Sequence, residues 1–176
     1  PRLWQPHEGL KLGFACAGRC VEPCLTAFFE DVARHGMPGL MVAPHANFAA
    51  RLLREKFSVP LISVLLYPMA FVSAHEIPGG ILAANWLRLL PVFLRKLILA
   101  HVAPYDRFAM PYVRESCRVH GVTPPRNLHQ AWWHSPDGVL ALFPAWYGRP
   151  QPDWPPNCLH WDFPLADLSA AKPLSP

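Results

Sequence analysis

Two short apolar runs, residues 39–43 and 60–66, constrain the fold of this chain more than any other feature. Neither run alternates apolar with polar positions, which is typical of strands in a parallel sheet that is covered on both faces. Apolar residues at helical spacing precede each run, over residues 25–33 and again over residues 48–57. Helix, strand, helix and strand with short links predict an α/β fold with a Rossmann-like, doubly wound parallel sheet.

The pattern continues through the second half of the chain. Residues 82–120 have a helical pattern that is interrupted by Pro91, Pro104 and Pro111. Beyond them we predict one short helix and two more strands, joined by an aromatic loop that is rich in proline. These elements occupy residues 128–133 (helix), 138–143 (strand), 144–156 (loop) and 159–163 (strand).

One stretch of the helical region, residues 86–99, is apolar nearly all round apart from three basic side chains, Arg88, Arg95 and Lys96. A helix packed between neighbouring elements has this composition, and so does a helix that lies in a lipid surface. A second apolar stretch, residues 57–74, is uncharged and about as long as a membrane span. Since Pro60 and Pro68 bracket its β-branched part, we interpret it as a buried strand followed by a loop.

The composition narrows the possible partners. The chain is 52% hydrophobic and 16% charged, with a formal net charge of +4, which describes a folded, moderately basic protein. Its basic residues do not form runs interleaved with aromatic side chains, so we predict no nucleic-acid partner. A weak attraction to an anionic membrane surface or to a nucleotide phosphate is compatible with this charge.

The five cysteines include Cys16, Cys20 and Cys24, whose spacing would align them on a helix. A metal or cluster site is one interpretation. The spacing lacks the paired Cys-x-x-Cys of structural zinc sites, and Pro23 is expected to interrupt the helix. We therefore predict free thiols in a reduced, cytoplasmic protein without a metal site, with membrane association as an alternative.

In doubly wound sheets, ligands bind outside the carboxyl ends of the strands. This rule places the loops at residues 44–47 and 67–80 in the predicted site. Their aromatic and apolar side chains, with a few polar groups among them, suit a flat lipophilic ligand. The candidate binding residues are His45, Asn47, Tyr67, Met69, Phe71, Ser73 and His75.

Five of these candidates, His45 and the loop residues Tyr67, Met69, Phe71 and His75, also have purely structural interpretations, as do three tryptophans elsewhere. His45 could contact the ligand or assist proton transfer, or it could cap the helix that begins near Asn47. The loop aromatics, of which Phe71 is one, could simply pack the loop. Trp132 and Trp133 are expected to anchor a helix to the sheet rather than to touch a ligand, and Trp154 and the proline-rich loop around it are expected to form a stiff scaffold. We predict no catalytic residue from these patterns.

Four stretches, taken together, resemble the bacterial and fungal glycosyltransferases that include sterol glucosyltransferases and macrolide or rhamnolipid-type transferases. The resemblance extends over about residues 31–167, and it rests on all four stretches in this order, of which the fourth is the most specific. The four stretches are residues 42–60, residues 63–68 with Phe71 and Ser73, residues 132–137, and residues 142–147 with 151–157 and 163–165.

The resemblance implies one half of a GT-B enzyme, in which two Rossmann-like domains face each other across a cleft. The amino-terminal domain of such an enzyme holds the acceptor, and the carboxyl-terminal domain holds a nucleotide-diphosphate sugar. A hexose is then transferred with inversion to a hydroxyl of a lipophilic acceptor such as a sterol or polyketide, without a required metal. A general base removes the proton of that hydroxyl.

This chain departs from the family at two places. The Gly-rich turn after the first strand is missing, and the usual base with it; the His-Gly-Gly run of the donor domain is also missing. The resemblance therefore implies an acceptor-side fragment that binds no cofactor, needs a carboxyl-terminal donor-binding domain as its partner, and is inactive alone. The expected division is residues 1–30 as a poorly matched leader, 31–168 as a partial acceptor domain and 169–176 as a linker. The alternative is a non-catalytic α/β module that binds an apolar ligand or a membrane surface.

Overall fold

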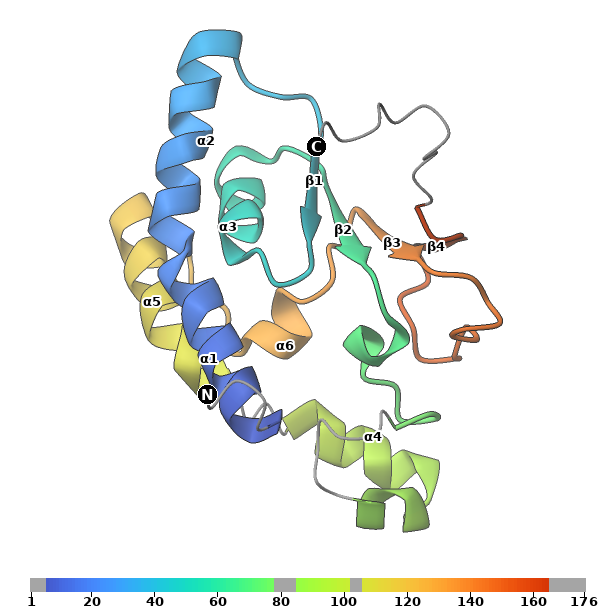
Figure 1. The fold of residues 1–176 in the computed structure, drawn as a ribbon. Coiled ribbons are helices and arrows are strands. Elements are labelled where there is room, and N and C mark those ends of the chain that lie inside the picture. Colours follow the sequence, from blue (N-terminus) through green and yellow to red (C-terminus); the bar gives the residue numbers. More distant parts are fainter. Residues whose placement is uncertain (1–5, 78–84, 102–105, 165–176) are drawn as a thin grey trace, which may run out of the picture.

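The structure is a computed structural model that describes residues 6–77, 85–101 and 106–164. Its four strands form one all-parallel sheet in the order β1-β2-β3-β4, which confirms the predicted Rossmann-like α/β class (Figure 1). The strands are β1 (Met41–Pro44), β2 (Leu61–Leu65), β3 (Gly138–Leu142) and β4 (Cys158–Trp161). The helices are α1 (Pro6–Arg19), α2 (Val21–His35), α3 (Phe48–Phe57), α4 (Val92–His101), α5 (Asp106–His120) and α6 (Leu128–Ala131), with the 3-10 helices η2 (Pro68–Phe71) and η3 (Asn85–Leu89).

Local capping sets the ends of the helices next to the sheet. The Asn47 side chain accepts a hydrogen bond from the backbone N–H of Ala50 at 3.2 Å, and so begins α3. Ser58 ends that helix in the left-handed region, at φ 57°, and its N–H bonds the carbonyl of Arg54. Gly36, at φ 84°, ends α2 in a backbone conformation that favours glycine.

One face of the sheet, the inner face, carries the main core. Met41, Ala43 and Leu61 point into it and meet Phe48 and Leu52 of α3, all of them buried. Helices α1, α2, α3 and α5 gather beside β1, whereas β4 lies at the far side of the sheet (Figure 1). A second, smaller core forms around β3 and the segments that follow β2 and β3.

The opposite face of the sheet, the outer face, is largely open among the described residues. Parallel register places Val42, Leu159 and Trp161 on it, and their exposed fractions are 62%, 70% and 70%. The uniform burial predicted for residues 39–43 is therefore wrong, because β1 alternates buried and exposed positions. The apolar residues at these positions have the composition of covered strands, but no described helix covers them.

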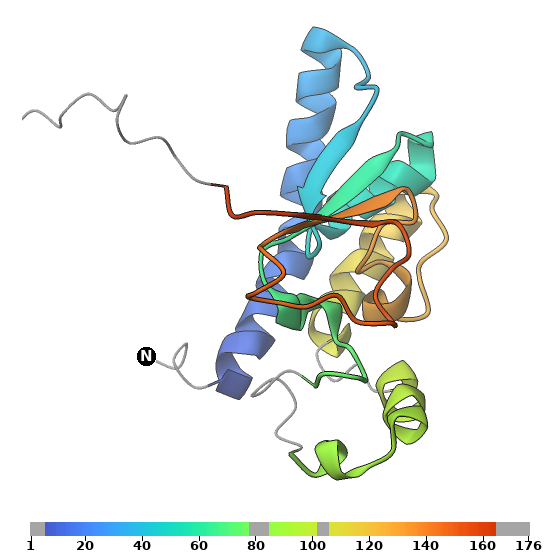
Figure 2. The same cartoon turned by 90° about the vertical axis from the view of Figure 1, so that its right-hand side faces the viewer.

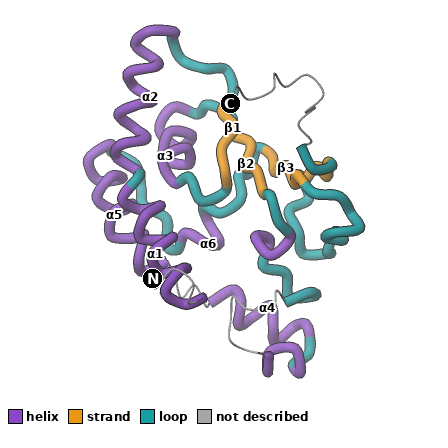
Figure 3. The backbone as a smooth tube through the Cα atoms, in the orientation of Figure 1, coloured by secondary structure: helices purple, strands orange, loops and turns teal. Residues whose placement is uncertain are grey.

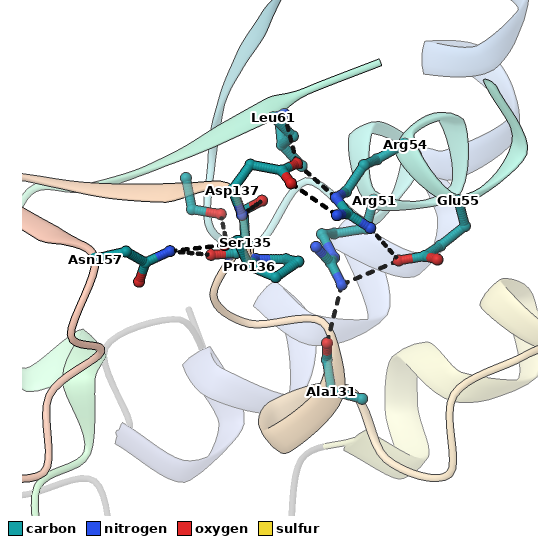
Figure 4. Close-up of polar contacts among 10 residues, drawn as sticks. Arg51, Arg54, Glu55, Leu61, Ala131, Ser135, Pro136, Asp137 and Asn157 are labelled. Atoms are coloured by element: carbon teal, nitrogen blue, oxygen red, sulfur yellow. Dashed lines mark hydrogen bonds and ion pairs between the residues drawn. The ribbon is translucent and has the colours of Figure 1, made fainter. Parts of the chain in front are cut away.

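The amino end of the sheet is held by a polar cluster (Figure 4). Arg54 binds Asp137 through two hydrogen bonds of 2.6 and 2.7 Å, and the same carboxylate accepts the N–H of Leu61 at 3.0 Å. The Arg54 guanidinium lowers the pKa of Asp137 to about 2. Since this cluster joins the end of α3 to the starts of β2 and β3, it aligns the strands at the end of the sheet away from the predicted ligand loops.

The first two helices correct one prediction and bear on another. Pro23 does not interrupt a helix, because it lies in the first turn of α2, where proline is tolerated.

Cys16 and Cys20 face each other with sulfurs 3.9 Å apart, and the described residues contain no group of three side chains that could hold a metal. By length and composition the stretch Glu8–His35 passes as a candidate membrane span; here its Val21 and Leu25 are fully buried in the main core.

The region predicted as helical over residues 82–120 is confirmed in its described part as η3, α4 and α5. Pro91 immediately precedes α4, but the interruption predicted at Pro111 is wrong, because Pro111 lies inside the continuous helix α5. Pro104 and residues 82–84 lie outside the described residues. No residue of α4 is buried. Leu87 of η3 is buried, so residues 86–99 pack against the molecule through η3, whereas no such burial is observed in α4.

Candidate functional site

The loops that follow β1, β2 and β3 emerge at the same end of the parallel sheet (Figure 3). The rings of His45, after β1, and Tyr67, after β2, are in contact with centroids 5.8 Å apart. The two predicted loops are therefore neighbours, as the rule on strand ends predicts. Residues 78–80 of the second loop lie outside the described residues.

A cavity of about 720 Å³ opens at this end of the sheet. Its volume is in the range of small-molecule sites. The loop after β2, the η3–α4 region and the loop after β3 build its walls. The lining residues are Tyr67, Pro68, Met69, Ser73, His75, Glu76 and Ile77 from the first, Arg88 and Arg95 from the second, and Tyr147, Gln151 and Trp154 from the third.

Asp153 ties two of these walls together. Its carboxylate accepts the Ser73 hydroxyl at 2.6 Å and the backbone N–H of Ala74 at 2.7 Å. The Ser73 oxygen in turn accepts the backbone N–H of His75 at 3.0 Å. Ser73 is therefore committed to shaping the loop, and its hydroxyl is not a free nucleophile.

A close approach at Gly148 seals the walls at a second point. A Cβ at this position would overlap the side chain of Pro68 and would come within 2.8 Å of Phe143. Only glycine leaves enough space for the loop after β3 to lie against the first residue of η2. The shape of the cavity thus depends on a contact between segments about 80 residues apart in the sequence.

The polar groups of the cavity come from all three walls. The His75 ring lines it, and its Nε2 is buried without a hydrogen-bond partner among the described residues. Burial raises the pKa of Tyr67, so its hydroxyl stays protonated at neutral pH as a hydrogen-bond donor. Gln151 donates to Glu76 at 2.8 Å and closes the opposite side.

Both cavity arginines bond to backbone carbonyl groups. Arg95 donates to the carbonyl oxygens of Leu90 at 2.7 Å and Ala74 at 3.2 Å, and also to that of Arg88. Arg88 donates to Ile77 at 3.2 Å. These bonds fasten η3 and α4 to the loop after β2, and they leave two positive charges at the cavity with no carboxylate partner among the described residues.

Trp154 forms an aromatic wall of the cavity. Its ring stacks on Phe71 with centroids 3.9 Å apart and on His160 with centroids 5.3 Å apart. The structural role predicted for Trp154 is thus observed, together with a cavity surface that was not predicted. Phe71, predicted as a ligand contact, is 6% exposed in the second core and does not line the cavity.

His45 and Asn47 also lie outside the cavity lining. Asn47 is the cap of α3. His45 is buried, its ring lies 4.5 Å from that of Trp133, and its Nδ1 has no hydrogen-bond partner among the described residues. Burial lowers the pKa of His45, so the ring is neutral at pH 7. Of the seven predicted residues, the structure brings Tyr67, Met69, Ser73 and His75 together around the cavity.

Sequence reasoning missed the third wall, which contributes Tyr147, Gln151 and the Asp153 clamp. A usable signal was present, because β3 is a parallel strand and the loop after it obeys the same rule as the loops after β1 and β2. That loop was instead interpreted as a stiff scaffold. Trp132 and Trp133 are buried, as expected of anchors, and the Trp133 indole N–H bonds the Ala70 carbonyl at 2.6 Å.

Comparison with known proteins adds no identification. No family model, no curated protein and no solved structure matches this chain.

Proposed function

We propose that this chain is the acceptor-binding part of an inverting hexosyltransferase, and that the cavity holds a lipophilic acceptor. The observation that supports this most is the position and lining of the cavity: it lies at the carboxyl end of a parallel sheet, and aromatic and thioether side chains give it an apolar surface beside the polar side chains. Tyr147, Trp154 and Met69 offer apolar surface to a flat molecule. The Tyr67 hydroxyl and the His75 ring offer hydrogen bonds to an acceptor hydroxyl.

The proposed reaction needs a second domain. In it, the acceptor oxygen forms a bond to the anomeric carbon of the sugar, while the bond from that carbon to the nucleotide diphosphate breaks. The proton of the acceptor hydroxyl passes to a general base. The contribution of this chain is to hold the acceptor so that its hydroxyl faces the donor, since positioning supplies much of the rate in such reactions.

The binding step is tested with the chain alone. We expect a hydroxysterol delivered from cyclodextrin to bind, and UDP-glucose to show no measurable binding, when each is titrated and followed by calorimetry. Met69→Ala should raise the Kd for the sterol about fivefold, the equivalent of about 1 kcal/mol of lost apolar contact. Met37→Ala is the matched control, because Met37 is exposed and remote from the cavity lining.

Two results would contradict the proposal: a sterol that does not bind, or equal effects of the two methionine substitutions. The catalytic part is tested by joining the chain to a nucleotide-sugar-binding domain and measuring sugar transfer. Sterol binding without any transfer in the joined protein would instead favour the non-catalytic binding module.

A further inference from the structure

The η3 and α4 region lies at the periphery of the molecule, is joined to the loop after β2 by Arg88 and Arg95, and carries an exposed apolar surface. In both views α4 lies away from the sheet and from the other helices (Figures 1 and 2). Leu87 of η3 is buried, but four large apolar side chains of the two elements are exposed: Trp86 (55%) and Leu89 (86%) of η3, and Phe93 (68%) and Leu97 (58%) of α4. We call these four residues the η3–α4 surface. An apolar helix without a single buried residue requires a partner that removes these side chains from water.

The charge around this surface indicates the chemistry of that partner. Residues 77–105 contain Arg88, Arg95 and Lys96 and not one Asp or Glu. The net charge of this segment is therefore +3, out of a net charge of +4 for the whole chain. Exposed apolar side chains, an indole and basic residues on one short amphipathic element are the combination that binds anionic lipid interfaces.

We propose that the η3–α4 surface docks on an anionic lipid bilayer. A helix of ten residues is too short to span the hydrocarbon core, so α4 would lie in the plane of the interface with Phe93 and Leu97 inserted. The partner is a membrane rather than a protein because the attraction requires only a dense layer of negative charge above an apolar phase. No acidic side chain of the segment opposes such a layer.

Docking by this surface also places the cavity next to the bilayer. Arg88 and Arg95 belong to η3 and α4 and line the cavity as well, so the element that meets the lipid forms one wall of the site. A lipophilic acceptor could then pass from the bilayer into the cavity without crossing water. This last step rests on the proposed function, whereas membrane docking itself does not.

The test uses the whole chain and vesicles without sterol. We expect co-sedimentation with phosphatidylcholine vesicles that contain 30 mol% phosphatidylglycerol, and at least tenfold weaker binding to phosphatidylcholine alone. Lys96→Gln should weaken binding to the anionic vesicles about fivefold. The double variant Leu89→Gln, Phe93→Gln should weaken it at least tenfold, because both side chains leave the apolar phase.

Leu12→Gln is the control. Leu12 is exposed on α1, inside the other apolar helical stretch Glu8–His35, and this variant should bind vesicles like the unchanged chain. Binding that is lost in Leu12→Gln but kept in the double variant would overturn the proposal. So would a chain that dimerises through Leu89 and Phe93 without binding lipid, since its partner would then be a protein.

Hydroxysterol binding from cyclodextrin separates the two proposals. Sterol binding without vesicle binding would refute docking and leave the proposed function intact. Vesicle binding without sterol binding would support docking and refute the proposed function.

Discussion

Three histidines near the carboxyl end of the sheet lie in apolar surroundings. His45 and His129 contact the Trp133 ring, and His134 stacks on Phe71 with centroids 5.4 Å apart. Burial lowers the pKa of all three, and it lowers that of His134 to about 4. The other two imidazoles make a smaller contribution to this lowered pKa of His134, while Asp106 partly offsets the effect of burial on the pKa of His129. At the residue scale, the fold therefore holds these imidazoles neutral.

The first prediction concerns acid sensitivity. Between about pH 6.5 and pH 4 the unfolded chain binds a proton at His134 and the folded chain does not, so the free energy of unfolding falls as the pH falls. The loss is at most about 3 kcal/mol, since one pKa unit corresponds to about 1.4 kcal/mol. Urea denaturation at pH 7, 6, 5 and 4.5 measures it, and His134→Gln should flatten the slope.

His35→Gln is the control for this slope, because His35 is exposed at the end of α2, where it pairs with Asp31. Asp137 does not interfere, since its stabilising effect is lost only when the pH falls below about 4. A slope that is equal in the unchanged chain and in His134→Gln would show that this histidine is not held neutral by the fold.

At the scale of elements, the crossing of α1 and α5 depends on one small residue. A Cβ at Gly18 would lie 2.9 Å from the Ala109 Cα and 3.0 Å from its carbonyl oxygen. The backbones of the two helices therefore meet closely there, and backbone atoms cannot move aside as the end of a side chain can. Gly13, on the same helix, is exposed and has nothing within 4 Å of its would-be Cβ.

The second prediction compares these two glycines. Gly18→Ala should lower the free energy of unfolding by about 1–3 kcal/mol, because the helices must separate. Gly13→Ala should raise it by about 0.5–1 kcal/mol, since alanine favours an exposed helix more than glycine does. Chemical denaturation of both variants at pH 7 measures the difference. Effects of the same sign would contradict the close crossing.

At the scale of the whole molecule, the sheet is covered unequally. The inner face is filled by helices, while the outer face presents Val42, Leu159 and Trp161 to solvent among the described residues. Strand β1 is also an edge strand, so the backbone N–H and C=O groups on the side away from β2 have no partner strand within the described sheet. Exposed apolar faces and open edges of this kind recruit other chains.

The third prediction follows from this open face. At micromolar concentration the chain should self-associate, and the double variant Val42→Lys, Leu159→Lys should shift it towards monomer in sedimentation velocity. Val119→Lys is the control, because Val119 is 58% exposed on α5, away from the sheet. A monomeric unchanged chain, or a control as effective as the double variant, would show that the outer face does not drive association.

The sequence by itself determined the local elements and their class. Apolar spacing located α3, β2 and β3, and the alternation of helix and strand predicted a parallel sheet whose carboxyl end holds the candidate site. The predictions of these elements and of a parallel sheet held because helical period and strand burial are local properties of consecutive residues. The place of the site stays a prediction.

Only the tertiary structure decided which side chains line the cavity. Phe71 was predicted as a ligand contact, but its ring stacks on that of Trp154, which lies some 80 residues further along the chain. The Asp153 clamp on Ser73 and the approach of Gly148 to Pro68 are equally distant in sequence. Such contacts depend on how the loops after β2 and β3 pack against each other, which a local pattern of residues does not predict.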